Sequence, residues 1–458
     1  MSPANIAKSD TVEEHSKKQN GLQEESHGNL LILGLVAPLA GIGAGVLGAF
    51  FRLALEKANH LRNLLVAWAH QWNIGGFAVL LTVITVSAAV AAWLVRRFLP
   101  HASGSGIPQV EAVLNDELPQ PPARLIVVKF IGGVLAIGSG LALGREGPTI
   151  QMGASISYLT GKWLKRSRAD CRVLLAAGAG AGLATAFNAP ISGAVFVLEE
   201  LLKRFESRIA IAALAASASA IWVERLILGD HPCFAVGHLM KPDFIQEPLY
   251  LLLGMGAGLA GLIYNKTLLK GLKTADHFSA LPIELRAALM GAAVAAVAWF
   301  APALVGGGDP LTQRALNGAG VLTLLPVLYI LRLGLITGSY SVGTPGGLFA
   351  PLLVLGAVLG LWVGKLCVLV LPAMGIQPVG FALVGMAALF TGIVRAPVTG
   401  IILVTEMTAN VNMLLPMIVA CFAAMLVPTF FGDAPIYDAL GARLFAHERE
   451  QTEKPAES

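Results

Sequence analysis

Gly144-Arg145-Glu146-Gly147-Pro148 is the stretch that most constrains the fold, because it places a flexible turn directly before a long apolar segment. Glycine lets the backbone bend sharply, and proline is favoured in the first turn of a helix. Gly104-Ser105-Gly106-Ile107-Pro108 and Gly346-Gly347-Leu348-Phe349-Ala350-Pro351 also precede apolar segments. The free N–H groups and the positive dipole end of a helix start attract anions. The sequence therefore predicts three helix starts that suit an anion.

Two ordered blocks of sequence recur at nearly one offset. Residues 144–154 match residues 347–357 at four Gly, Pro or Ala positions, 203 residues later. Residues 189–199 match residues 396–406, 207 residues later, and the match includes Glu199 and Glu406. Repeated halves that meet at a binding site near the bilayer midplane are typical of transporters.

The composition excludes a soluble globular protein. The 458-residue chain is 55% hydrophobic and 13% charged, with a mean hydropathy of +0.71, whereas a soluble domain carries about 25% charged residues. The net charge of +4 does not indicate nucleic acid as a partner, because the basic residues form short clusters between apolar segments. Such clusters are typical of loops that flank a membrane.

The charge pattern predicts how the chain crosses the membrane. Basic clusters at 162–172, 203–208 and 266–273 are expected to face the cytoplasm, and the acidic loop 229–247 the outside. Residues 172–203 then begin and end on the same side. Two limbs of about 15 residues would each span about 22 Å, which is too short to cross. We therefore expect a re-entrant helical pair that reverses at residues 187–190.

The same features divide the chain into segments. Residues 1–28 are polar and lack the apolar core of a signal peptide, so this end is expected to stay in the cytoplasm. The expected segments are a cytoplasmic tail at 1–28, a first membrane half at 29–228, an external loop at 229–247, a second membrane half at 248–442 and a cytoplasmic tail at 443–458.

Energetics require the helix starts to act together. Moving an unpaired ion into a low-dielectric medium costs on the order of tens of kcal/mol, whereas one helix terminus returns roughly 0.3–2 kcal/mol. An ordinary kink remains the alternative for any single turn. For an anion to bind, several termini, hydroxyl donors and water must converge.

The three glycine-rich segments and Pro435-Ile436-Tyr437 resemble, in order and spacing, the signature segments of the chloride channel (CLC) family. The resemblance extends from about residue 30 to residue 442, and Gly144–Pro148 is its most specific part. It implies an all-α integral membrane protein built from two inverted-topology halves of broken and tilted helices. It also implies a homodimer with one anion pathway per subunit, in a bacterial inner membrane.

The resemblance assigns the anion-binding residues. Ser105 and Tyr437 would offer hydroxyl groups to a central anion, and the backbone N–H groups of Leu348 and Phe349 would complete its shell. Such donors replace hydration without a fixed counter-charge that would trap the ion. A serine at this position is similar to chloride-preferring members, whereas proline marks nitrate-preferring ones. The expected supporting residues are Gly104, Gly106, Pro108, Arg145, Gly147, Glu199 and Ala350.

Glu146 is the strongest candidate for a gate. A carboxylate at an anion-attracting helix start can occupy the anion site when ionised and leave it when protonated, so proton and halide compete. The resemblance gives this position the role of gating glutamate and outer proton acceptor. The structural alternative is an ion pair with Arg145 or Lys129.

Glu200 is the candidate inner proton acceptor. The resemblance names this position, which is apolar in channel members, so an acid here favours exchange over passive flow. The alternative is a surface carboxylate paired with Lys203 or Arg204. The neighbouring Glu199 is more suited to the scaffold, as its repeat partner Glu406 suggests.

The resemblance therefore implies a secondary active transporter that exchanges chloride for protons, and not an enzyme. Its partners would be chloride ions, protons, the lipid bilayer and a second copy of the chain. A passive chloride or fluoride channel of the same architecture is the alternative. Gln109, which stands where many relatives carry an acid, leaves the transport rate open.

Metal and cofactor chemistry is not indicated. Cys171, Cys233, Cys367 and Cys421 are far apart and form no ligand motif, so we expect neither a metal site nor a disulfide framework, and no cofactor. A remote alternative is an intramembrane hydrolase. It would need a buried nucleophile and base, yet the histidines fall mostly in tails and loops.

Overall fold

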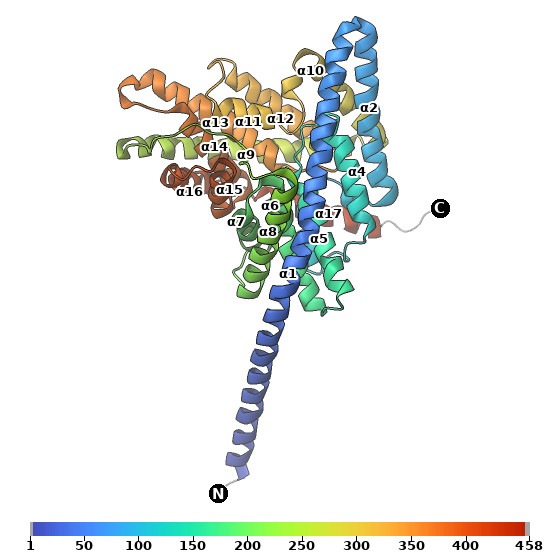
Figure 1. Ribbon diagram of the computed structural model, residues 1–458, viewed down its shortest axis with the longest axis vertical. Helices are drawn as coiled ribbons and strands as arrows, with labels where there is room; N and C mark the ends of the chain where they lie inside the picture. The colour runs from blue at the N-terminus through green and yellow to red at the C-terminus, as the bar shows by residue number, and fades with distance from the viewer. Residues whose placement is uncertain (1–2, 454–458) are drawn as a thin grey trace.

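The computed structural model describes the backbone of residues 3–453 and the side chains of residues 30–446. Within that part of the chain the regular structure is helical, with two isolated β-bridges and no strand (Figure 1). The predicted tails, 1–28 and 443–458, lie wholly or largely outside the described side chains.

The first half of the fold runs from α1 to α8. Its helices are α1 (Pro3–Gln71), α2 (Asn73–Phe98), α3 (Ile107–Leu114), α4 (Arg124–Gly138), α5 (Glu146–Trp163), α6 (Arg168–Phe187), α7 (Pro190–Phe196), which continues into a π-helical turn (Val197–Leu201), and α8 (Ser207–Leu228).

The second half repeats this order from α9 to α16, and α17 follows it. Its helices are α9 (Glu247–His277), α10 (Ile283–Phe300), α11 (Asp309–Leu316), α12 (Leu325–Ser341), α13 (Phe349–Val370), α14 (Pro378–Val394), α15 (Pro397–Thr408), α16 (Leu414–Phe430) and α17 (Ile436–Glu453).

The packing follows the repeat. Helix α1 packs on α8 as α9 packs on α16, and α5 packs on α6 as α13 packs on α14. The pairs α2–α10 and α7–α15 join equivalent helices of the two halves. The prediction of an all-α protein with two inverted halves of broken helices is confirmed.

Small residues explain why the central helices approach so closely. A Cβ atom on Gly153 of α5 would overlap the backbone oxygen of Gly178 in α6. The repeat partner Gly356 of α13 has the same relation to Gly385 of α14. Close backbone contact at small residues is a usual way for helices to associate in a bilayer, where dispersion replaces the hydrophobic effect.

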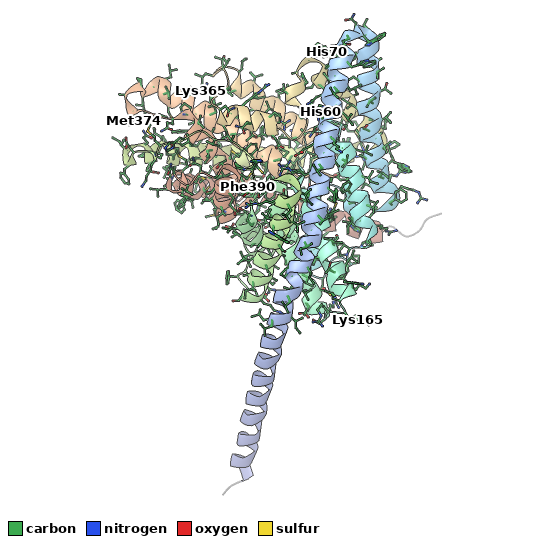
Figure 2. All side chains as sticks on the ribbon, in the orientation of Figure 1. His60, His70, Lys165, Lys365, Met374 and Phe390 are labelled. Carbon is green, nitrogen blue, oxygen red and sulfur yellow. The ribbon has the colours of Figure 1, made fainter. Side chains whose placement is uncertain are left out.

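Seven helical segments of the described residues are long and apolar enough to cross a membrane, and α6 is one of them. Figure 2 shows Lys165, from a predicted cytoplasmic cluster, at the lower edge of the helical bundle, whereas His70 and Lys365 lie near its upper edge.

The prediction of two limbs of about 15 residues between 172 and 203 is wrong. The chain does reverse where expected, at Asn188, which has a left-handed φ of 52°. However, α6 begins at Arg168, where the Ser167 hydroxyl accepts a hydrogen bond from the N–H of Asp170 (3.1 Å). Arg168 and Arg172, which were expected to lie in a loop, therefore belong to α6. This helix has 20 residues, whereas α7 has 7.

Candidate functional site

The structure brings the three glycine-rich turns together. The N–H of Gly144 donates to the oxygen of Gly347 (2.8 Å), and the N–H of Gly347 donates back to Gly144 (2.7 Å). The oxygen of Gly104 accepts from the N–H of Gly346 (3.0 Å), and the N–H of Gly104 donates to Thr344 (3.2 Å). Turns that are about 40 and 200 residues apart in sequence thus form one hydrogen-bonded junction.

Each turn leads directly into a helix. Helix α3 starts at Ile107, α5 at Glu146 and α13 at Phe349. A Cβ atom on Gly147 would overlap the backbone of Ser105 and of Gly347, so the junction requires glycine there. The first N–H groups of a helix have no acceptor within it. Three helix starts with such groups therefore meet in one place inside the protein.

The Glu146 carboxylate lies at this junction. The residue is fully buried, and its carboxylate fills the space where Gly144 and Gly347 lack a side chain. It lies near the backbone N–H groups of Phe349 and Ala350, yet neither oxygen makes a hydrogen bond of good geometry. An acidic side chain thus occupies the space between two anion-attracting helix starts.

The alternative ion pairs of Glu146 are not formed. Arg145 donates through Nε to the oxygen of Ala186 (2.9 Å) and faces Asp309 (3.7 Å). The Nζ of Lys129 donates to the oxygens of Ala102 (3.0 Å) and Gly104 (2.8 Å). Both cations bind backbone oxygens of the surrounding loops, and neither forms a salt bridge with the Glu146 carboxylate.

The two predicted hydroxyl groups lie close to the junction. Ser105 is buried, and its Oγ accepts a hydrogen bond from the N–H of Ile107 (3.2 Å). The Tyr437 hydroxyl is buried without a hydrogen-bond partner among the described residues. Its ring stacks on Phe349, with centroids 6.0 Å apart, and Phe349 also packs on Phe390 (4.8 Å), which Figure 2 labels.

The structure adds two tyrosines that the sequence reasoning missed. Tyr264 of α9 and Tyr340 of α12 are buried within electrostatic range of Tyr437, and Tyr264 is also within range of Glu146. The Tyr340 hydroxyl accepts from the N–H of Ser105 (3.4 Å). Neither residue belongs to a glycine-rich motif. The one feature of the sequence that could have indicated them is a tyrosine, with its polar hydroxyl group, inside an apolar helix.

Glu199 and Glu406 form a reciprocal pair of caps. The Glu199 carboxylate accepts from the N–H groups of Val398 (2.9 Å) and Thr399 (2.6 Å) and from the Thr399 hydroxyl (2.7 Å). The Glu406 carboxylate accepts from the N–H of Ile191 (3.0 Å) and from the N–H (2.8 Å) and hydroxyl (2.6 Å) of Ser192. Each carboxylate therefore caps the start of a short helix in the other half, Glu199 that of α15 and Glu406 that of α7.

Glu200 differs from its neighbour. The π-helical turn directs Glu199 to the start of α15, whereas Glu200 is buried and its Oε1 has no hydrogen-bond partner among the described residues. Lys203 does not pair with it. Instead, Lys203 binds Glu111 (3.2 Å) and Asp438. Partial burial lowers the pKa of Lys203, but these two carboxylates raise it more, so the net shift is upward.

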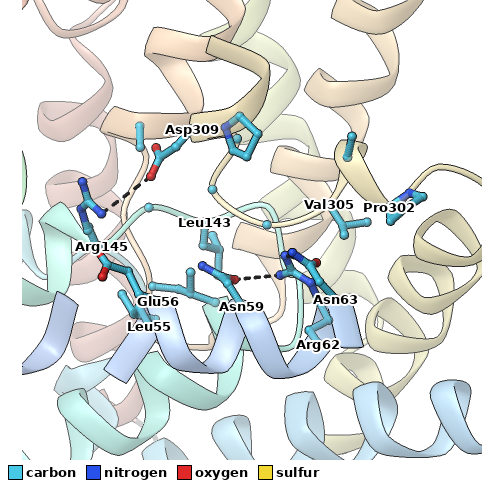
Figure 3. Close-up of a pocket in the computed structure, with 18 of the residues that line it drawn as sticks. Leu55, Glu56, Asn59, Arg62, Asn63, Leu143, Arg145, Pro302, Val305 and Asp309 are labelled. Carbon is cyan, nitrogen blue, oxygen red and sulfur yellow. Dashed lines mark hydrogen bonds and ion pairs between the residues drawn. The ribbon is translucent and has the colours of Figure 1, made fainter. Parts of the chain in front are cut away.

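Cavities reach the junction from both sides. One cavity, of about 660 Å³, is lined by Gly144, Arg145 and Ala350, and also by Cys233 (Figure 3). Because Cys233 belongs to the predicted external loop, we call it the outer cavity. The other cavity, of about 740 Å³, is lined by Gly104, Pro108 and Tyr340, and we call it the inner cavity. The hydrogen-bonded turns lie between the two cavities.

A helical membrane protein with an anion-attracting junction between two cavities has the architecture of an ion transporter or channel. The profile of the Voltage gated chloride channel family matches residues 87–429. The H(+)/Cl(-) exchange transporter ClcA of Cronobacter sakazakii is 37% identical over 435 residues, which cover 92% of each chain. ClcA of Vibrio parahaemolyticus is 37% identical over 428 residues, covering 91% of this chain and 90% of that protein. The chain belongs to the chloride channel (CLC) family.

Solved structures agree with this assignment. A slow cyanobacterial Cl⁻/H⁺ antiporter superposes with a TM-score of 0.87 at 33% identity, covering 90% of this chain and 98% of the other. A CLC-type fluoride/proton antiporter superposes with a TM-score of 0.72 at 22% identity, covering 89% and 97%, and shares the fold.

Proposed function

We propose that the protein is a secondary active transporter that exchanges chloride for protons across the membrane. The relatives at 37% identity are named as H(+)/Cl(-) exchange transporters. The observation that carries the proposal is the Glu146 carboxylate, which is buried among helix starts that suit an anion and has no hydrogen-bond partner of good geometry within residues 30–446.

The anion is held by donors without a fixed counter-charge. The hydroxyl groups of Ser105 and Tyr437 and the N–H groups of Leu348 and Phe349 form its shell. Each donor contributes little against a desolvation cost on the order of tens of kcal/mol. The meeting of three helix starts supports this shell, and weak binding at several points allows the ion to leave.

Glu146 makes proton and chloride compete for one place. When ionised, its carboxylate occupies the junction as an anion would. When protonated, it loses its attraction to the helix starts and yields to chloride. The outer cavity borders Arg145 and Gly144, so the released side chain exchanges its proton with the outside.

Glu200 accepts protons from the cytoplasmic side. It is buried beside a loop rich in charged residues and is not neutralised by Lys203. The Tyr437 ring is within electrostatic range of both Glu200 and Glu146. A proton that moves from Glu200 to Glu146 would therefore travel close to the Tyr437 ring.

Electrical recording under opposed gradients tests exchange against passive flow. In reconstituted bilayers, an imposed pH gradient shifts the zero-current voltage if proton movement is coupled to chloride. A voltage fixed by chloride alone would identify a passive channel. Glu200→Gln is expected to abolish proton uptake while chloride flux continues. The control Glu206→Gln removes a carboxylate from the same loop, where its one ion pair within residues 30–446 is with Arg204, and this variant should remain coupled.

We also propose a homodimer in the inner cell membrane, with both termini cytoplasmic, no cofactor and no enzymatic activity. The family resemblance supports the dimer and the orientation. Chemical cross-linking in native membranes checks the first, with a product of twice the 47.7 kDa subunit mass expected. Cysteine accessibility at each end checks the second.

A further inference from the structure

The Ser105 turn has a counterpart in the second half. Gly306-Gly307-Gly308-Asp309-Pro310 follows Gly104–Pro108 by 202 positions and precedes α11 as the first turn precedes α3. Gly104 and Gly106 have φ values of +61° and +86°, and Gly306 and Gly308 have +78° and +100°. The two turns thus share a left-handed backbone that favours glycine.

A buried cation anchors each turn in the same way. Lys129 donates to the oxygens of Ala102 and Gly104. Arg332, which is 203 positions later and also fully buried, donates to the oxygens of Leu304 (2.8 Å), Gly306 (3.0 Å) and Gly307 (3.1 Å). The second turn is therefore built like the anion-binding one. It faces the outer cavity, whereas the Ser105 turn faces the inner one.

The outer cavity carries more positive than negative groups. Its charged lining consists of Arg52, Glu56, Arg62, Arg145, Asp309 and Arg314, beside His70. Arg52 is neutralised by Glu56 (3.0 Å) and Glu224 (3.2 Å), and Asp309 faces Arg145. Within residues 30–446, neither Arg62 nor Arg314 has a carboxylate partner. The cavity thus retains positive charge that its own carboxylates do not neutralise.

Arg62 lies beside the second turn. Its guanidinium donates to the amide oxygen of Asn59 (3.0 Å) and to the backbone oxygen of Gly138 (3.4 Å), and Figure 3 shows the contact with Asn59. A Cβ atom on Gly306 would lie 3.1 Å from Arg62 Nη1. The buried Nε has no acceptor among the described residues. All these partners are neutral, so the charge of Arg62 is available to an anion.

We propose that the outer cavity is a loading site for a small inorganic anion from the external solution, held by Arg62 and by the N–H groups of Gly307 and Gly308. The N–H of Gly306 does not contribute, because it donates to the oxygen of Gly140 (2.7 Å). The inference rests on the proposed exchange function, because the anion then moves inward past Arg145 to the Glu146 junction. Asp309 limits the site, since its carboxylate competes with the anion for Arg145.

Bromide diffraction of the full chain tests the site directly. We expect anomalous bromide density beside Arg62, and a separate peak near Ser105 and Tyr437. Arg62→Gln should weaken the outer peak and keep the central one, while Asp309→Asn should strengthen the outer peak. A central peak without an outer peak in the unmodified protein overturns this inference alone. Absence of the central peak, even at saturating bromide in Glu146→Gln, contradicts the proposed function instead.

A transport measurement gives an independent readout. Removal of one positive charge about 5 Å from an anion in a water-filled cavity weakens its binding about fourfold. Arg62→Gln should therefore raise the half-saturating external chloride concentration about fourfold and leave the internal one unchanged. Lys57→Gln, which removes an exposed charge from the same helix outside the cavity lining, is the control. An equal change on both sides, or in both variants, rejects the proposal.

Discussion

The reciprocal caps predict that loss of the Glu199 or the Glu406 carboxylate lowers the unfolding free energy equally. Only the loss of Glu199 is expected to reduce the coupling of proton and chloride movement. Each carboxylate accepts two backbone N–H groups and one hydroxyl. Glutamine keeps one acceptor oxygen and turns the other into a donor, so two charge-assisted bonds are lost. Such bonds are worth about 1.5–3 kcal/mol each. Because the hydroxyl of Ser192 or Thr399 can turn to accept from the new NH₂ group, we expect a net loss of about 3 kcal/mol in either variant.

Function separates the two variants. Glu199 adjoins Glu200 on the π-helical turn. When the side chain at position 199 no longer binds the start of α15, the turn is held less firmly and Glu200, the proposed proton acceptor, can move. Glu199→Gln should reduce the shift of zero-current voltage with pH, whereas Glu406→Gln should keep it. Denaturant unfolding in detergent measures the stability of both. If the unfolding free energies of both variants lie within about 0.5 kcal/mol of that of the unmodified protein, the caps do not stabilise the fold as predicted. Equal loss of coupling in both variants would refute the special role of the Glu199 side.

Further predictions concern the junction and its cytoplasmic side. Glu146→Gln should leave chloride flux intact and make the zero-current voltage independent of pH, as recorded in bilayers. Tyr437→Phe removes a buried, unpartnered hydroxyl, so calorimetry should show weaker chloride binding while the unfolding free energy changes by less than about 1 kcal/mol. Gly147→Ala would overlap the backbone of Ser105 and Gly347, and thermal unfolding should show a loss of about 1–3 kcal/mol. The pKa of Lys203 is raised above its usual 10.5, so its stabilisation is present below that pH and is lost in stronger alkali. Lys203→Met should remove this alkaline loss in unfolding measured against pH.

Local signals were sufficient to predict the frame of the site. Glycine and proline marked the starts of α3, α5 and α13, and Asn188 lies within the predicted reversal. The repeat also indicated a scaffold role for Glu199 through its match to Glu406. These features depend on the backbone chemistry of a few adjacent residues.

Other features depend on contacts between distant helices. Tyr264 and Tyr340 approach Tyr437 only because α9, α12 and α17 pack around the junction, and no motif encodes that packing. The second glycine turn was missed because Gly307 and Asp309 replace Ser105 and Ile107. Its likeness to the first lies in φ angles and in the carbonyl contacts of Arg332.

The exchange of caps between the halves has a consequence for biogenesis. When translation has reached Glu199, the amide groups that its carboxylate binds are still about 200 residues from being made. The cap of α7 is equally late, because the N–H groups of Ile191 and Ser192 bind Glu406. The start of α7 therefore stays uncapped, in the translocon or in the lipid, until α15 has been made. We expect that the two halves, expressed as separate polypeptides, mature only when they are produced together in one cell.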